Sequence, residues 1–536
     1  MIVKHRIVPN VYQDSVALMV VSSKLLALDG IDAASVVMAT PANLENLLAA
    51  GLGGHQPAKP SDLLVAVAGE DDACEAALEL AAELLAATPG IEGPSTKGTL
   101  TQPRPSNLQR AVAADPALNL ALISVPGPYA AAEAMKALRL GLSVMIFSDN
   151  VSEDHELVLK QYAARQGLMV MGPDCGTAIL NGMPLGFANV VRRGPIGVVG
   201  ASGTGMQEVT SRVHNLGSGI SQALGTGGHD LSEAIGGLSM LTGMAALDED
   251  PDTEVIVLIS KPPSPSVAAT VLHRARELRT PVVVVFLGAD PASFTGHGVQ
   301  AALTLADAAD AAVAIIEGRP PPPPPPPTAH IAPDSAAALT AAIDALHQDQ
   351  QAIRGIFCGG TFCYEAQVLC QRQGLSGGSN TPIAGNTKLH NNAEDAGSTH
   401  TFIDMGDDQF TQGRPHPMID PSLRDERVAH EAANPGTAVL LVDVVLGLGS
   451  AADPTSGLIQ ALNRGRHDAA GPGRQPIVIA HVCGTDGDPQ DRARTVSALQ
   501  AAGVTVASSN AEAARWAAFV ATTVTGRTAA AVGGAG

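Results

Sequence analysis

The most distinctive chemical signal in the sequence is a glycine-rich turn between an expected strand and an expected helix. A short apolar run ends in Gly-Ala-Ser-Gly-Thr-Gly, residues 200–205, and a helical pattern follows directly. Glycines let a ligand approach the backbone, and the amides and dipole of a helix N-terminus attract anions. We therefore expect an anion or phosphate site formed by Ser202, Gly203, Thr204 and Gly205. The alternative is an ordinary helix cap, in which Ser202 serves only the backbone.

A second polar loop, Gly-Thr-Gly-Gly-His-Asp at residues 225–230, follows the next expected strand. Parallel strands end at one edge of a sheet, so Gly227 and Gly228 are expected near the same anion. His229 is a candidate catalytic residue, as a general base. A lone histidine in a loop is more often a surface residue, and that interpretation stays open.

Two further loops follow strands of the first predicted unit and are expected to line a cofactor-binding rim. Asp149 and Asn150 follow one strand, and Asp174 and Cys175 lie in the loop Met-Gly-Pro-Asp-Cys-Gly-Thr, residues 171–177. A nucleophilic cysteine needs a lowered pKa, whereas the adjacent Asp174 carboxylate would raise the pKa of Cys175. We therefore interpret Cys175 as a packing residue near a ligand.

A proline-stiffened loop at residues 413–420 carries two more catalytic candidates, Arg414 and His416. Arginine offers a planar bidentate donor and histidine a titratable one, which suits a small acidic substrate. Neighbouring carboxylates could instead hold Mg²⁺ or simply be solvated, and we predict no metal site. Asp443 ends the strand Val-Leu-Leu-Val-Asp and is either functional or a buried cap.

These loops need elements that bring them together, and the sequence pattern indicates parallel sheets. Short apolar runs alternate with alanine-rich helical stretches, which is the rhythm of βαβ units. Runs such as Val-Val-Val-Val-Phe at 282–286 lack alternation, as expected when helices cover both faces of a sheet. We predict an α/β fold with three doubly wound parallel-sheet units. Eight prolines at 320–327 predict a semi-rigid spacer, and residues 55–115 a helix with irregular flanks.

Composition narrows the class of protein. Of 536 residues, 45% are hydrophobic and 16% are charged, so the chain can bury several cores. The formal net charge of -20 argues against nucleic acid or an anionic membrane as partner. The six cysteines show no paired or zinc-site spacing, and no apolar run predicts a membrane span or an export signal. We expect a cytoplasmic protein with reduced thiols, and a homo-oligomer is left open.

The loops at 171–177, 197–205 and 225–230 resemble the alpha subunit of succinyl-CoA synthetase, and more closely the FdrA family of acyl-CoA synthetase-like proteins. Residues 11–19 and 413–421 are also similar to FdrA signatures. The resemblance implies group transfer among an acid, phosphate and a thiol, with CoA as cofactor. It also implies four segments: a Rossmann-like CoA-binding-type domain over 1–185, a ligase domain over 186–318, a Pro-rich linker over 319–350 and a second, flavodoxin-like ligase domain over 351–525.

Three departures from the synthetase pattern fall on the segments that perform the synthetase reaction. Residues 10–15 replace the glycine turn that would meet the pyrophosphate of CoA, and the long phosphohistidine loop is shortened. The acid that supports that histidine falls at Lys261, which would stabilise an anion directly and becomes a catalytic candidate. The resemblance does not extend to the ATP-grasp half of the beta subunit, so we expect no nucleotide site in this chain, and either partner subunits supply nucleotide chemistry or there is none.

Three functions follow from the residues and the resemblance. The first is an acyl-CoA synthetase-like transfer that acts on an acyl or carbamoyl phosphate and a small acid without a phosphohistidine. The second is a subunit of an oxamate carbamoyltransferase in allantoin degradation, a purine pathway. The third is a non-catalytic assembly subunit, which an anion turn without a paired nucleophile and base would also fit.

Overall fold

The computed structural model describes the chain except for residues 1, 10, 12–14, 54–57, 88–104, 295–297, 323–332, 390–399, 412–413, 469–473 and 534–536. The chain divides into two compact units, of which unit 1 holds residues 1–118 and 408–420. Unit 2 holds residues 119–407 and 421–536. Most of the predicted proline spacer, from residue 323 onward, lies outside the described residues.

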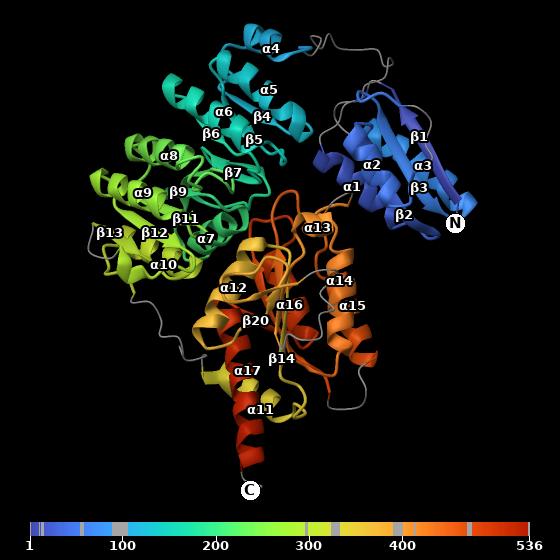
Figure 1. Ribbon diagram of the computed structural model, residues 1–536, viewed down its shortest axis with the longest axis vertical. Helices are drawn as coiled ribbons and strands as arrows, with labels where there is room; N and C mark the ends of the chain where they lie inside the picture. The colour runs from blue at the N-terminus through green and yellow to red at the C-terminus, as the bar shows by residue number, and fades with distance from the viewer. Residues whose placement is uncertain are drawn as a thin grey trace. The chain divides into compact units, whose positions relative to one another are not determined.

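Unit 1 is built on a three-stranded antiparallel sheet in the order β1–β3–β2 (Figure 1). The central strand β3 pairs antiparallel with both neighbours, and all seven of its residues are buried. The elements of this unit are β1 (Ile2–Val8), α1 (Ser15–Leu26), β2 (Ile31–Met38), α2 (Pro41–Ala49), β3 (Leu63–Gly69), α3 (Asp71–Ala87), α4 (Leu108–Ala114) and, from the later segment, α13 (Asp408–Thr411).

The structure therefore divides the first 185 residues differently from the single parallel unit that the sequence predicted. Strand β3 lies where a helix with irregular flanks was expected. Leu63, Val65 and Val67 pack into one apolar cluster, whereas Leu64 and Ala66 pack into another on the opposite face. Because both faces are covered, the strand has no polar alternation that would reveal it.

Unit 2 begins with a three-stranded parallel sheet in the order β4–β5–β6. Helix α6 starts at the cap Ser152, whose side chain accepts from the His155 amide, and ends at Gly167 with φ of +68°. The elements here are β4 (Leu120–Ile123), α5 (Gly127–Arg139), β5 (Ser143–Ile146), α6 (Glu153–Gln166) and β6 (Val170–Met171).

A seven-stranded sheet follows in the order β13–β12–β11–β9–β10–β7–β8. Its strands β9 to β13 run parallel, whereas β7 pairs antiparallel with β10 and β8. The elements are β7 (Thr177–Leu180), β8 (Met183–Gly186), β9 (Arg193–Gly200), α7 (Gly203–Asn215), β10 (Ile220–Gly225), α8 (Leu238–Glu249), β11 (Val255–Ser260), α9 (Pro265–Glu277), β12 (Val282–Phe286), the 3₁₀ turn η1 (Pro291–Ser293), β13 (Val299–Ala301) and α10 (Leu305–Ile316).

The second seven-stranded sheet is parallel throughout, in the order β16–β15–β17–β14–β18–β19–β20. The elements are α11 (Pro333–Asp344), β14 (Ala352–Phe357), α12 (Gly360–Arg372), β15 (Gly378–Ser379), β16 (Thr387–Lys388), β17 (Thr401–Asp404), α14 (Ser422–Ala433), β18 (Thr437–Val445), α15 (Ser456–Asp468), β19 (Ile477–Cys483), α16 (Arg492–Ala501), β20 (Thr505–Ala507) and α17 (Asn510–Gly533).

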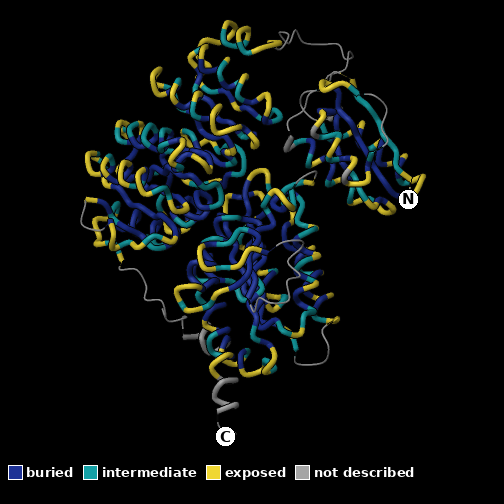
Figure 2. The backbone as a smooth tube through the Cα atoms, in the orientation of Figure 1, coloured by how far each residue is buried: buried dark blue, intermediate teal, exposed yellow. Residues whose placement is uncertain are grey.

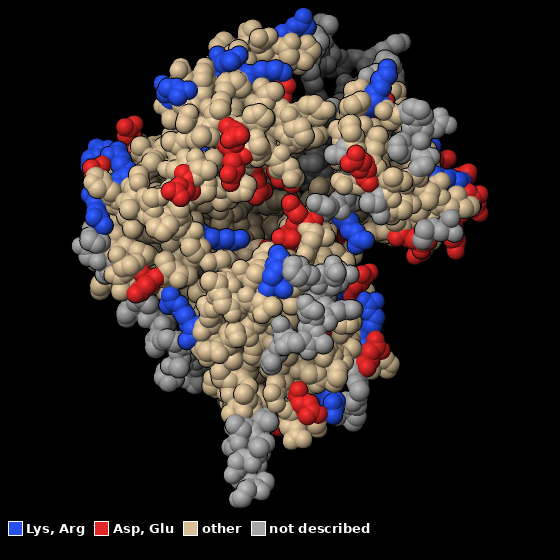
Figure 3. All heavy atoms as spheres, in the orientation of Figure 1, with Lys and Arg blue, Asp and Glu red and all other residues tan. Residues whose placement is uncertain are grey.

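The predicted fold class, α/β with several parallel sheets, is confirmed. The central strands β11, β12 and β18 are buried along their whole length, which explains their uninterrupted apolar runs. Figure 2 shows the buried segments of the backbone mainly in the interior of each part of the chain. On the face drawn in Figure 3, Lys and Arg side chains stand singly or in small groups among uncharged ones. Within the described part of the chain, no helix combines the length and hydropathy that crossing a membrane requires.

Candidate functional site

The glycine-rich turn connects β9 to α7 as predicted, and Ser202 caps the helix by accepting from the Gly205 amide at 3.0 Å. Two of the glycines have packing reasons: a Cβ on Gly200 would lie 2.5 Å from Cγ of Met206, and one on Gly205 would lie 3.1 Å from Cγ2 of Ile259. Those two glycines therefore do not by themselves indicate a ligand. The amides of the first turn of α7 have no partners inside the helix, so these amides could bind an anion.

A second helix N-terminus, which the sequence analysis missed, lies against the first. Strand β14 runs through Cys358 and Gly359 into α12, and Oγ1 of Thr361 lies 2.5 Å from Oγ of Ser202. A Cβ on Gly359 would lie 3.0 Å from Cγ2 of Thr204, so the two helices begin in contact. Each N-terminus carries a partial positive charge, and together they favour an anion beside them.

Asp443 and Asp404 stand at the base of α12. Asp443 is fully buried and accepts from the amides of Cys358 at 2.6 Å and Gly359 at 2.8 Å, so the cap interpretation of this residue is correct. Asp404 ends β17, and a Cβ on Gly360 would lie 2.5 Å from its Oδ2. Burial raises the pKa of Asp404 to about 7, although the positive charge of Lys261 opposes that rise. A carboxyl group with that pKa can exchange a proton near neutral pH.

Lys261 lies at the same sheet edge as the two helix N-termini. It directly follows β11, which pairs with β9 so that Ile259 lies opposite Gly200. The Lys261 side chain is exposed, and its Nζ lies 5.7 Å from the ring centroid of Tyr364 on α12. Unit 2 thus gathers a cation, two helix N-termini and two buried carboxyl groups, those of Asp404 and Asp443, at one place.

The loop after β10 has a mainly structural explanation. Gly227 has φ of +85°, and a Cβ there would lie 2.2 Å from the Pro173 carbonyl oxygen, so close packing requires this glycine. Gly228 is exposed, and a Cβ there would meet no atom within 4 Å. The His229 side chain is 62% exposed, with Nδ1 3.6 Å from Oε2 of Glu156. The surface interpretation of His229 therefore fits the structure better than that of a positioned general base.

Below this loop lies a buried ion network that anchors it. Nζ of Lys160 on α6 lies 2.6 Å from Oε1 of Glu156 and 2.8 Å from Oδ1 of Asp230. It also donates to the Thr226 carbonyl oxygen at 2.9 Å, and all three charged side chains are almost fully buried. The network ties the sheet β4–β5–β6 to the loop after β10.

Asp149, Asn150 and Asp174 are exposed beyond the ends of β5 and β6, in the positions predicted for a cofactor rim. Cys175 is 2% exposed, and burial raises its pKa to about 12. Its Sγ would lie 2.5 Å from a Cβ on Gly225, so this thiol fills a packed interior, as interpreted from the sequence. Direct contact of Cys175 with a cofactor is not supported by this burial, and the role of the three polar residues stays a prediction.

Arg414 and His416 belong to unit 1, whereas Lys261 belongs to unit 2. Arg414 is exposed. Burial lowers the pKa of His416 to about 4, and its Nδ1 accepts from the Met418 amide at 3.2 Å. This burial favours the neutral imidazole at neutral pH, and the role of His416 toward an acidic substrate stays a prediction.

Comparison with known proteins identifies the domains. Residues 356–520 match the CoA-ligase family model, and residues 191–288 match the CoA binding domain. Residues 1–99 match the model described as AllF, heavy metal-associated domain. The CoA-binding match lies inside the segment predicted as the first ligase domain. The fold and these matches define a protein with CoA-ligase and CoA-binding domains.

Relatives place the chain more closely. The uncharacterized protein YahF of Escherichia coli strain K12 is 44% identical over 513 residues, which cover 95% of this chain and 97% of YahF. This chain belongs to the same family as YahF. The alpha subunit of ADP-forming succinate–CoA ligase from Methanothermobacter thermautotrophicus is 27% identical over 219 residues, 38% of this chain and 72% of that subunit. Among solved structures, the dinucleotide-forming acetyl-coenzyme A synthetase 1 of Ca. Korarchaeum cryptofilum is 16% identical over 77% of this chain and 85% of that one, with a TM-score of 0.29.

The descriptions of these family models name two groups, a heavy metal and CoA. The residues present fit the two groups unequally. Heavy metals prefer soft thiolate ligands, but residues 1–99 contain a single cysteine, Cys74, which is fully buried on α3 and has its pKa raised chiefly by burial. Within the described residues of this domain, a single buried thiol does not form the thiolate site that heavy metals prefer. A phosphate group, whether of CoA or of an acyl phosphate, does fit the first turn of α7, where Gly203 and Thr204 offer amides.

Proposed function

We propose that this protein is an FdrA-type, CoA-ligase-like transferase that acts on a phosphate anhydride, either an acyl phosphate or carbamoyl phosphate. The observation that carries the proposal is the contact between the N-termini of α7 and α12 with Lys261 at the same sheet edge. The hydroxyls of Ser202 and Thr361, which bond each other in the free protein, would turn to the phosphate oxygens.

In this reaction a thiol or amine attacks the carbonyl carbon of the anhydride, and the bond from that carbon to the phosphate oxygen breaks. Inorganic phosphate leaves with the bonding electron pair, and the helix amides with Lys261 stabilise its negative charge. The nucleophile loses one proton, which Asp404 can accept near neutral pH. CoA, when bound, supplies the thiol, whereas a small acid that carries an amide or amine nitrogen serves carbamoyl transfer. A partner subunit would supply any nucleotide chemistry.

A thermal-shift titration of the full chain with phosphate, carbamoyl phosphate, acetyl phosphate and CoA tests the proposal. A ligand at about 100 times its Kd stabilises the native state by roughly 2.7 kcal/mol. We expect a shift with phosphate and with at least one anhydride. A shift with acetyl phosphate and CoA indicates thioester chemistry, and one with carbamoyl phosphate indicates carbamoyl transfer. No shift with any of the four contradicts the proposal and favours a non-catalytic assembly subunit.

A further inference from the structure

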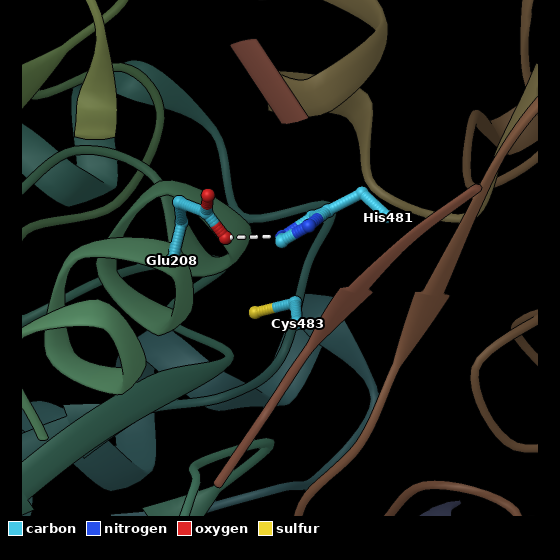
Figure 4. Close-up of side chains that lie close together, drawn as sticks. All are labelled: Glu208, His481 and Cys483. Carbon is cyan, nitrogen blue, oxygen red and sulfur yellow. Dashed lines mark hydrogen bonds and ion pairs between the residues drawn. The ribbon is translucent and has the colours of Figure 1, made fainter. Parts of the chain in front are cut away.

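Three side chains of metal-ligand type converge behind the two helix N-termini. Glu208 lies on α7, and His481 and Cys483 lie on β19, in the second seven-stranded sheet. Figure 4 shows the carboxylate, the imidazole and the thiol directed toward one another. One ligand atom from each lies within 4.8 Å of the others, and every one of these residues is at most 3% exposed. The cluster therefore joins the two halves of unit 2.

The hydrogen bonds of this cluster are incomplete. Oε2 of Glu208 lies 2.6 Å from Nε2 of His481, and the Asn510 amide donates to its other oxygen at 3.3 Å. Within the described part of the chain, the buried Nδ1 of His481 has no hydrogen-bond partner. A buried polar atom without a partner is costly, so its position in a fold calls for an explanation. A metal ion between the two side chains would bind Nε2, the ring nitrogen that faces the Glu208 carboxylate, and Nδ1 would then carry the ring proton.

A cavity borders the cluster and leaves room for an ion, and two arginine side chains also line it. A cavity of about 150 Å³ is lined by the three residues together with Ser211 and Asn215. Arg212 and Arg492 also line it. The charge of Arg212 is matched by Asp310, at 2.6 and 2.9 Å, and Nε of Arg492 donates to the Val482 carbonyl oxygen at 3.3 Å. One carboxylate and one thiolate would balance a divalent ion.

The chemistry of the donors selects the metal. One nitrogen, one oxygen and one sulfur ligand form a set that zinc accepts, with bonds of about 2.0–2.3 Å and a tetrahedral arrangement. Such bonds place ligand atoms about 3.3–3.8 Å apart, which small side-chain movements would reach here. Hard cations such as Mg²⁺ prefer oxygen ligands and do not suit a thiol.

We propose that Glu208, His481 and Cys483 bind one Zn²⁺ ion, with a water molecule from the cavity as fourth ligand. Binding forms one zinc–sulfur, one zinc–nitrogen and one zinc–oxygen bond to the protein. The Cys483 thiol loses its proton to solvent, and a ring nitrogen of His481 donates its lone pair. The ion would join α7 to β19 and so hold the two seven-stranded sheets together. This site is independent of the proposed transferase function.

Reconstitution of the full chain tests the site. The metal-free protein is titrated with Co²⁺, which replaces zinc and reports thiolate ligation through an ultraviolet charge-transfer band, and the zinc content is measured after dialysis against Zn²⁺. We expect one equivalent of zinc per chain, a charge-transfer band and a rise in Tm with metal. Less than 0.2 equivalents of zinc, or cobalt binding without the band, would overturn the proposal.

Variants assign the ligands. Cys483→Ser is expected to abolish the charge-transfer band and weaken metal binding at least 100-fold, and Glu208→Gln to weaken it at least tenfold. The control is Cys370→Ser, which replaces another fully buried thiol that lies on α12 outside the cluster and should leave binding unchanged. Metal binding that survives Cys483→Ser at full strength would place the metal outside this cluster and refute the site. If Cys483→Ser does not fold, the zinc content of the wild type and the titration of Glu208→Gln still test the proposed zinc site.

Discussion

Replacing Lys261 by methionine tests whether its positive charge binds the ligand or only stabilises the fold. Its side chain is exposed, and its nearest described aromatic partner is the Tyr364 ring, at 5.7 Å from Nζ to the centroid. Exposed cation–π contacts are worth about 0.5–1 kcal/mol, so the free energy of unfolding should change little. Loss of phosphate affinity in a variant that keeps its Tm then reports on the ligand, whereas kcat/KM also responds to the loss of the Lys261 charge near Asp404.

The size of the functional loss follows from what the ammonium group would contact. A hydrogen bond to a charged group contributes about 1.5–3 kcal/mol. At about 1.4 kcal/mol for each factor of ten, Lys261→Met should weaken phosphate binding roughly 10- to 150-fold. Isothermal titration with inorganic phosphate measures the affinity, and phosphate release from acetyl or carbamoyl phosphate measures kcat/KM. Both quantities should fall together.

The matched control is Lys136→Met on α5, where the lysine is 63% exposed and pairs with Glu133 on the surface. This variant should keep wild-type phosphate affinity, and Lys261→Arg should recover part of the loss because it keeps the charge. A fall of less than tenfold in Lys261→Met for both affinity and kcat/KM would remove Lys261 from the site.

Three further predictions concern the framework of the site. Asp443→Ala leaves the buried amides of Cys358 and Gly359 without acceptors, so we expect a loss of about 2–6 kcal/mol in the free energy of unfolding. A Tm equal to that of the wild type would contradict the role of Asp443 as a cap. Asp404 has a folded pKa of about 7 against an ordinary 3.8, so deprotonation costs the native state stability as pH rises through this range. Asp404→Asn should therefore gain roughly 3–4 kcal/mol over the wild type between pH 4 and pH 8, and parallel pH–Tm curves would refute this. Lys160→Met leaves the buried carboxylates of Glu156 and Asp230 unpaired, so we expect the free energy of unfolding to fall by about 3–5 kcal/mol, with a lower Tm at neutral pH. A fall of less than about 1 kcal/mol would show that the network does not anchor the loop.

The parallel sheets could be predicted from sequence because their strands and helices have separate signals. The uninterrupted apolar run at 282–286 coincides with β12, and the helix expected directly after the glycine-rich turn is α7. The antiparallel sheet of unit 1 could not be predicted in this way. Its central strand β3 is apolar along its whole length and lies between weakly patterned segments, so neither alternation nor flanking turns revealed it.

The site was predicted in part. Ser202 follows β9, and Lys261 follows β11. The two residues lie at one edge of the sheet because β9 and β11 are neighbouring strands. The N-terminus of α12 was missed, although Gly359, Gly360 and Thr361 follow a strand in the same strand–glycine–helix pattern. Its contact with α7 depends on how the two sheets pack, which residue spacing does not encode. Cys483 was known only as one of six unpaired cysteines, and its neighbours come from distant parts of the chain.

The most direct test of the central claim is to locate a bound phosphate analogue. Crystals of the full chain soaked with tungstate, a tetrahedral oxyanion with strong anomalous scattering, would show where such an anion binds. Our account predicts one tungstate within hydrogen-bond distance of the first-turn amides of α7 and α12 and of Nζ of Lys261. Saturating tungstate that binds only elsewhere, or not at all, would contradict the claim that the two helix N-termini form a phosphate site.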